Sequence, residues 1–224
     1  ANKIGITLAG EAVTSLTTEA GVTIPTTGNP FIVAGGKLSV SGMAQTCNTW
    51  AKIKAVSPDG TGFIVSDTSL ADCYGAGATV HIASSTFIEV EGKDYTVTDI
   101  SLSGTDDVLI TVAADLSTIP LITEAQSAEF ATEVMFMDRN VQITGSGSSY
   151  FQVLHTPNVP QILNGVQFHH MGHAYQDDRY PIQFKYCGSA AGSDVSRNSI
   201  TSSNQRCISI DGTSDVTVSS NTAL

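Results

Sequence analysis

The densest group of side chains capable of acid–base or metal chemistry is the stretch HHMGHAYQDDR, which runs from His169 to Arg179. It holds three imidazoles, two adjacent carboxylates and a guanidinium group. Glycan hydrolysis needs two carboxylates that flank the scissile bond, and metal binding needs ligands that converge on one point. Asp177, Asp178, His169 and Arg179 are therefore the candidate catalytic residues, and His173 is a candidate glycan contact.

The same stretch also has a structural interpretation, as a solvated or glycan-contacting loop. Adjacent aspartates such as Asp177 and Asp178 usually point in different directions. His169 and His170 are expected on opposite faces of one strand, so only one of them can share a site with the aspartates. We therefore expect a structural or glycan-contacting loop rather than a catalytic centre, and we expect neither a metal nor a cofactor.

Four cysteines fall into two pairs by their spacing: Cys47 and Cys73 are 26 residues apart, and Cys187 and Cys207 are 20 apart. Neither pair has CxxC spacing and no histidine lies at zinc-finger distance, which disfavours zinc. Two local disulfides in a secreted protein are the preferred interpretation, and free buried thiols are the alternative.

Composition narrows the class of protein and of partner. The formal net charge of -11 disfavours nucleic acids and anionic membranes, because like charges repel. No apolar run of about 18 residues is present, so we expect no membrane insertion. The start, ANKIGITLAG, shows no signal peptide, so either the mature chain starts here or this is a piece of something longer. Low charge with abundant Ser, Thr, Gly and Val is typical of a β-rich protein that is extracellular or on the cell surface.

The pattern along the chain predicts an all-β fold. Short runs of alternating apolar and polar residues are separated by Gly, Asp, Asn and Ser. Residues 43–122 have hairpin spacing, with turns at Pro58–Gly60 and at Gly104–Asp106, and predict a small β-meander or barrel with Trp50 in its core. The one candidate helix, Thr123–Val134, reads equally well as a loop that enters a strand.

A different pattern, a repeat, occupies the C-terminal part of the chain. Three sets of residues recur at offsets of 23, 26 and 32: Val195, Asn198 and Ile200 as Val218, Asn221 and Ala223; Ile182 and Phe184 as Ile208 and Ile210; Val166 and Phe168 as Asn198 and Ile200. Such periods, with inward residues at i and i+2 and Asn at a turn, are typical of parallel β-helix rungs. We expect the two asparagines to stack or to bond adjacent backbone, and a Ser/Thr-rich β-sandwich is the alternative.

The last nineteen residues, RCISIDGTSDVTVSSNTAL, continue this repeat to the end of the sequence. They read as one strand of a rung followed by the start of the next. We expect an open rung here, which is either cut from a longer chain or capped by a partner.

Four stretches carry a resemblance to a known family: ATEVMFMDRNVQITG (131–145), VLHTPNVPQILNGVQFHHMGH (153–173), RYPIQF (179–184) and NQRCISIDGTSDVTVSSN (204–221). They resemble the extracellular family of fibrocystin-L, the cell-migration-inducing hyaluronidase and the transmembrane hyaluronidase. The resemblance implies a right-handed parallel β-helix of the pectin-lyase type over 123–224, open at its C-terminal end. It also implies the end of a glycine-rich β domain over 1–42 and a small β module over 43–122.

The chain departs from this family at two positions. Hyaluronidase-type relatives read R-Y-P-[IV]-H-F-H, and here Gln183 and Lys185 replace the two histidines. Glutamine cannot exchange protons, and an ordinary lysine stays protonated near pH 7. We therefore expect these two residues, together with His173, to contact a glycan rather than to transfer protons.

The primary functional prediction is a non-enzymatic structural or adhesive β-helix protein of the cell exterior. It would act as a repeating subunit of a surface fibre through its open β-helix ends, with copies of itself or the remainder of a longer chain as partners. The alternatives are a polysaccharide-degrading enzyme of hyaluronidase or lyase type, and a glycan-binding receptor ectodomain.

Overall fold

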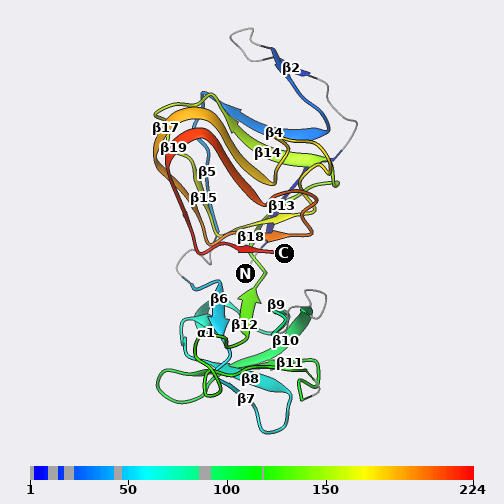
Figure 1. The fold of residues 1–224 in the computed structure, drawn as a ribbon, viewed down its shortest axis with the longest axis vertical. Coiled ribbons are helices and arrows are strands. Elements are labelled where there is room, and N and C mark those ends of the chain that lie inside the picture. Colours follow the sequence, from blue (N-terminus) through cyan, green and yellow to red (C-terminus); the bar gives the residue numbers. More distant parts are fainter. Residues whose placement is uncertain (1–2, 10–14, 18–22, 43–46, 86–91, 118) are drawn as a thin grey trace. The chain divides into compact units, whose positions relative to one another are not determined.

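A computed structural model describes residues 3–9, 15–17, 23–42, 47–85, 92–117 and 119–224 (Figure 1). The chain forms two compact units. The first unit joins residues 1–45 to residues 139–224, and the second comprises residues 46–138. We call the first unit the coil and the second the module.

The coil is built from parallel strands, apart from one antiparallel pair, β2–β3. Its strands are β1 (Ile4–Thr7), β2 (Ser15–Thr17), β3 (Thr23–Pro25), β4 (Asn29–Ala34), β5 (Ser39–Ser41), β13 (Val141–Thr144), β14 (Ser149–Leu154), β15 (Ile162–Asn164), β16 (Val166–His169), β17 (Ile182–Ser196), β18 (Ser199–Thr201), β19 (Ile208–Ser219) and β20 (Thr222–Ala223). One column of paired strands, or ladder, runs β1-β13-β16-β18-β20, and the other sheet runs β4-β14-β17-β15-β5 with β19 on β17.

The registers of these ladders confirm the three repeat offsets. Phe168 pairs with Ile200, 32 residues on. β17 pairs with β19 through Ile182 and Ile208 at an offset of 26, and through Val195 and Val218 at an offset of 23. Each repeat is therefore one turn of the coil, which we call a rung.

Two irregularities within β17 explain why one strand pair carries two offsets. Between Lys185 and Gly188 the strand has one residue more than β19, and between Ser189 and Ser193 it has two more. These three residues convert the offset of 26 into 23. Bulges of this kind bend a strand, and β17 and β19 curve together around the coil (Figure 1).

Stacked inward side chains form the core of the coil. Phe151, Phe168 and Phe184 are fully buried, and the rings of Phe151 and Phe168 are 6.1 Å apart at an edge-to-face angle. Each such side chain contributes about 1.5–3 kcal/mol through removal of apolar surface from water. The i and i+2 periodicity in the sequence thus corresponds to the inner face of each rung.

An asparagine ladder fixes one corner of the coil, as expected. Asn198 is buried, and its Oδ1 accepts the Val166 N–H at 2.9 Å. Its Nδ2 donates to the Leu163 carbonyl and to the Asn221 Oδ1 at 2.8 and 3.0 Å. Asn221 in turn donates to the Val195 carbonyl. One asparagine side chain per rung therefore forms hydrogen bonds with backbone groups of the rung before it.

At the corners of the coil, residues with a left-handed backbone conformation stack in columns. His155, Tyr186 and Gly212 have φ values of 46°, 53° and 54°, and the strand registers place them one above another. A Cβ added to Gly212 would lie 2.6 Å from the Tyr186 ring, so a side chain at that level would require this ring to move. A second column includes His170 and Ser202, with φ values of 55° and 52°. The repeated corner imposes this conformation even on residues that rarely adopt it.

The module is an antiparallel sheet in the order β6-β12-β9-β10-β11-β8-β7. Its elements are β6 (Trp50–Lys52), β7 (Ala55–Val56), β8 (Gly62–Val65), α1 (Leu70–Cys73), β9 (Thr79–Ile82), β10 (Lys93–Leu102), β11 (Val108–Val112) and β12 (Glu133–Phe136). Both predicted hairpins are present, β7 with β8 and β10 with β11. In the candidate helix Thr123–Val134, turns lead into β12 instead, so the loop interpretation is correct.

The cysteines behave differently in the two units. Cys47 and Cys73 form a disulfide in the module, as predicted. Cys187 and Cys207 are free thiols, so the second predicted disulfide is not formed. The Ile182 N–H bonds to the Cys207 carbonyl, so Cys207 lies at the level where β17 begins, five residues before Cys187. At about 3.3 Å per strand residue, that separation exceeds the reach of a disulfide.

The division into two units differs from the boundaries predicted at residues 42 and 122. Strands β1, β4 and β5 of the N-terminal segment pair with β13, β14 and β15 of the coil. Short N-terminal strands can pair with a parallel edge that lies far away in the sequence, which local pattern alone does not reveal. The module is thus an insertion between two parts of one coil.

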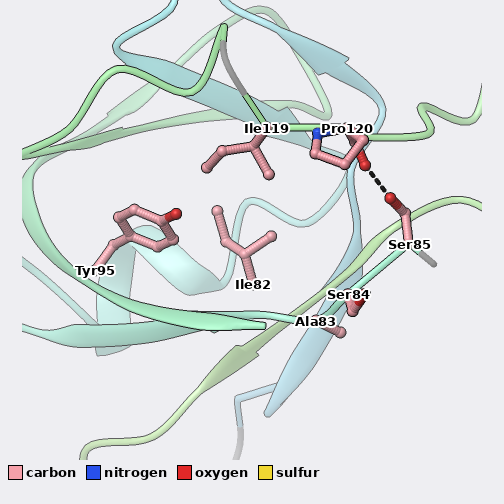
Figure 2. Close-up of a pocket in the computed structure, with 7 residues that line it drawn as sticks. All are labelled: Ile82, Ala83, Ser84, Ser85, Tyr95, Ile119 and Pro120. Carbon is pink, nitrogen blue, oxygen red and sulfur yellow. Dashed lines mark hydrogen bonds between the residues drawn. The ribbon is translucent and has the colours of Figure 1, made fainter. Parts of the chain in front are cut away.

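A cavity of about 20 Å³ lies in the module between Ile82, Tyr95 and Ile119 (Figure 2). The Ser85 hydroxyl donates to the Pro120 carbonyl at its rim. Burial raises the pKa of the Tyr95 hydroxyl. A space of this size holds one water molecule, so it is no ligand site. Among the described residues, no helix has the length and apolar character needed to cross a bilayer.

Candidate functional site

A polar pocket of about 280 Å³ opens on the outer face of β14 and β17. The loop before β17 supplies Asp177, Asp178 and Arg179 to it, and β17 supplies Lys185 and Tyr186. The remaining lining residues are Ile24, Gln152, Leu154 and His155. Parallel pairing places Leu154 beside Lys185, so residues that are distant in sequence meet on this face.

A chain of hydrogen bonds crosses the floor of the pocket. The Gln152 Nε2 donates to the Gln183 Oε1 at 2.6 Å, and the Gln183 Nε2 donates to the Asp178 Oδ1 at 3.1 Å. The Lys185 ammonium donates to the other oxygen of Asp178 and forms an ion pair with it. Both oxygens of this carboxylate are therefore engaged by donors from β17.

The ion pair sets the protonation state of Asp178. The hydrogen bond from Lys185 lowers the pKa of this carboxyl below its ordinary value, against the opposing effect of desolvation, and the bond from Gln183 lowers it further. Asp178 is thus ionised at neutral pH. An ionised carboxylate cannot donate a proton to a leaving group, so Asp178 does not have the properties of a general acid.

Arg179 anchors the loop. Its Nη1 donates to the Asp178 carbonyl at 2.8 Å, and its Nε donates to the Thr27 hydroxyl at 3.1 Å. The guanidinium lies 4.7 Å from the centre of the buried Tyr150 ring. With its cation over an aromatic ring and two of its donors used, this side chain fastens the loop to the coil.

One wall of the pocket is aromatic. The rings of His155 and Tyr186 are 5.5 Å apart, because both residues occupy the same left-handed corner column. The Lys185 ammonium lies 5.1 Å from the centre of the Tyr186 ring, which is half exposed. This wall offers an apolar surface beside charged groups.

The structure brings together only part of the predicted site. Asp177, Asp178, Arg179 and Lys185 all line the pocket. Gln183 is fully buried beneath it, so this residue cannot contact a glycan as predicted. Its side chain faces away from the core, but the loop covers it and its amide bonds within the floor.

The predicted site residues His169 and His173 are not among the residues that line the pocket. His169 ends β16, and its Nδ1 lies 2.8 Å from the Thr201 hydroxyl. The rings of His169 and His170 are 6.1 Å apart and both are exposed, because the left-handed turn at His170 interrupts the alternation that predicted opposite faces. His173 is partly buried, and its N–H bonds to the Arg179 carbonyl at the base of the loop.

Sequence reasoning missed Gln152, His155 and Tyr186. Gln152 lies 31 residues before Gln183, its partner in the strand register. Extension of the repeat by one rung toward the N-terminus would have identified it. Across the described residues, no group of three His, Cys, Asp or Glu side chains is placed to hold a metal ion.

The ends of the coil form a second candidate site. Within the described strands, β1, β4 and β5 at one end and β19 and β20 at the other are each paired along one edge alone. Ile4, which pairs with the core residue Val141, is 62% exposed. Val218, which pairs with the core residue Val195, is 45% exposed. Both end faces thus present side chains at inward positions of the core.

Comparison with known proteins agrees with this architecture. The family model described as CEMIP beta-helix matches residues 152–224. Two G8 domain-containing proteins of Dictyostelium discoideum are 27% and 25% identical over alignments of 204 and 205 residues, and each alignment covers 86% of this chain. The chain spans 17% and 14% of the length of these relatives.

The matches cover the stretches from which the family was predicted. They also agree with the Cys47–Cys73 disulfide, since disulfides persist in oxidising compartments outside the cytosol. The comparisons thus support a family of CEMIP/G8 type: residues 152–224 match the CEMIP beta-helix, and most of the chain is similar to G8 domain-containing proteins.

Proposed function

We propose that this chain is a non-enzymatic structural and adhesive segment of an extracellular or cell-surface protein, built on a right-handed parallel β-helix. The parallel ladders support the β-helix, and connections between parallel strands are right-handed in nearly all proteins. The fold then acts as a stiff spacer that continues through its ends and presents loops along its side.

The proposal rests on residues at both ends of the coil that occupy inward positions of the repeat and are nevertheless exposed. Ile4 and Ile6 at one end, and Ile210 and Val218 at the other, continue columns that are buried in the middle of the coil. The end faces therefore match a further rung of parallel β-helix in shape, polarity and backbone pairing. A second copy of the chain or the remainder of a longer chain supplies that rung.

The pocket supports recognition rather than catalysis. Its one well-fixed carboxylate, Asp178, is ionised and bonded to Lys185 and Gln183, and its neighbour Asp177 is exposed. A glycan that contacts Lys185 and Tyr186 fits this arrangement better than a glycan that is cleaved.

Association in solution tests the end-face proposal. The chain of residues 1–224 is expected to form head-to-tail oligomers with increasing concentration, visible by sedimentation velocity and by negative-stain microscopy. Ile4→Asp and Val218→Asp each block one end and give monomers. Because the contact is heterologous, a mixture of the two variants gives dimers and nothing larger.

Leu102→Asp is the matched control, since Leu102 is exposed in the module, and this variant is expected to associate like the parent chain. A parent chain that remains strictly monomeric at every concentration would contradict the proposal.

A polysaccharide hydrolase or lyase is the second candidate, because Asp177, Asp178, Arg179 and Lys185 share one open pocket. Incubation with a panel of polysaccharides, followed by size-exclusion analysis, tests it. Depolymerisation by the parent chain that is lost in both Asp177→Asn and Asp178→Asn would establish this activity and overturn the non-enzymatic assignment. Unchanged polymer length is the expected result.

A further inference from the structure

Trp50 of the module is 44% exposed, although its sequence context predicts a core residue. It begins β6, the edge strand of the module sheet, and its indole lines a second open pocket of about 300 Å³. The other lining residues are polar apart from Ala51: Asn48, Lys52, Ser66, Asp67 and Glu124. All of these described lining residues belong to the module.

Hydrogen bonds to one another or to neighbouring segments of the module hold several polar groups of this pocket in place. The Asn48 Nδ2 donates to the Asp67 Oδ2 at 2.5 Å, and the Asp67 Oδ1 accepts the N–H and the hydroxyl of Ser69 at 3.0 and 2.6 Å. The Lys52 Nζ donates to the carbonyls of Ala128 and Glu129 at 2.8 and 3.0 Å. The pocket walls are thus set before a ligand enters.

These pocket-lining groups retain hydrogen-bonding capacity. Asn48 keeps its amide oxygen and one N–H, and the ammonium of Lys52 keeps one of its three donors. The Glu124 carboxylate accepts no hydrogen bond from the described part of the chain, while its backbone N–H is fixed to the Ile53 carbonyl. An indole side chain therefore shares one pocket with an amide, a carboxylate and an ammonium group.

We propose that this pocket, which we call the Trp50 site, binds a neutral saccharide. A sugar ring presents a face of C–H groups that packs on an indole, and its neighbouring hydroxyls act as donors and acceptors to carboxylate and amide groups. Lys52, Asp67 and Glu124 together carry one net negative charge, on a chain of net charge -11. This charge disfavours uronic acids and sulfated sugars.

A peptide added along β6 fits the site less well. The strand has three residues, and the lysine that ends it reaches across to the carbonyls at 128 and 129. Short edges guarded by lysine are a common protection against strand addition. With a single aromatic platform, the expected dissociation constant for the saccharide is on the order of 0.1–1 mM.

Trp50 is the single tryptophan of the chain, so its fluorescence reports on this site alone. Neutral trisaccharides of glucose, mannose, galactose and N-acetylglucosamine are titrated into the whole chain, with a hyaluronan tetrasaccharide as the acidic probe. At least one neutral trisaccharide is expected to give a saturable change in emission, and the acidic probe none.

Single substitutions distinguish loss of saccharide binding from loss of folding. Glu124→Gln and Asn48→Ala are expected to weaken binding by about threefold to tenfold. Trp50→Ala is expected to weaken binding by about tenfold or more. Because this variant lacks the fluorophore, its binding is measured by calorimetry. Leu102→Ala, an exposed module residue outside the pocket, leaves binding unchanged and serves as the matched control. Far-UV circular dichroism verifies that each variant is folded.

The inference is overturned if none of the four trisaccharides changes the emission, or if binding persists in the Trp50→Ala variant. Preferential binding of the acidic probe would equally contradict it. None of these outcomes bears on end-to-end association of the coil, because the Trp50 site lies within the module.

Discussion

The coil and the module satisfy the backbone of short β-strands in opposite ways. In the coil, Ile200 pairs with a residue 32 positions earlier and a residue 23 positions later. In the module, β10 and β11 pair across a turn of a few residues. The coil therefore depends on side chains that repeat once per rung. The module has no such repeat, and it combines hairpins with long-range antiparallel pairs such as β6 with β12 and with one disulfide. This difference predicts which changes damage each unit.

Loss of the Cys47–Cys73 disulfide is expected to have the largest effect, and only in the module. The cysteines are 26 residues apart, and closure of a loop of this length stabilises a fold by about 3.5 kcal/mol. A Cys47→Ser/Cys73→Ser variant should lower the module unfolding transition in urea. Cys187→Ser in the coil is the control for loss of a thiol, and an equal shift of both transitions would contradict the division into two units.

Asn198→Ala is expected to destabilise the coil by about 2–3 kcal/mol. The substitution leaves the Val166 N–H and the Leu163 carbonyl without their partner at a buried corner. Asn48→Ala in the module removes one exposed hydrogen bond and should cost less than about 1 kcal/mol. Equal losses in chemical denaturation would show that the asparagine ladder has no special role.

Ser202→Gly should stabilise the coil by about 0.5–1 kcal/mol. Its φ of 52° places serine in the left-handed region, where removal of Cβ relieves strain that exceeds the added entropy of the unfolded chain. Ser209→Gly, in regular β19, is the matched control and should destabilise by a similar amount. Differential scanning calorimetry of both variants measures the sign, and a lower midpoint for Ser202→Gly would refute the corner argument.

The smallest effect concerns pH. Hydrogen bonds from Ser57 and Thr61 lower the pKa of Asp59 in the module from 3.8 to about 2. Since the folded pKa lies below the unfolded one, this contribution to stability is present above pH 3.8 and lost as the pH falls toward 2. Carboxyl NMR titration should give the low value, and Ser57→Ala should raise it.

Asp178 of the coil provides the contrast, because Lys185 is the main cause of its lowered pKa. Added salt should raise the pKa of Asp178 toward its ordinary value while that of Asp59 changes little. Equal salt dependence at both carboxyls would contradict this distinction.

The repeat explains how much of the coil could be predicted from the sequence. Offsets of 23, 26 and 32 predicted the pairing of strands as far apart as β16 and β18, because inward residues recur once per rung. The pairing of β1 with β13 could not be predicted, since the inserted module separates them by more than a hundred residues. Local pattern contains no information about such a long connection.

Only part of the candidate site could be predicted, because the rest depends on segments that are distant in the sequence. Asp177, Asp178 and Arg179 are contiguous and were identified by residue type. The burial of Gln183 depends on a loop that folds back over β17, and the exposure of Trp50 depends on β6 lying at a sheet edge. Alternation along a strand gives the face of a side chain, but it does not reveal what covers that face.

The unequal length of the rungs has a consequence for evolution and for engineering. The rung from Phe168 to Ile200 is nine residues longer than the one from Ile200 to Ala223, and the excess includes the loop at residues 172–179. The strand registers on both sides are unaffected. The loop is therefore a place where segments of differing length and sequence can be exchanged, so that one unchanging scaffold can acquire new recognition elements without refolding.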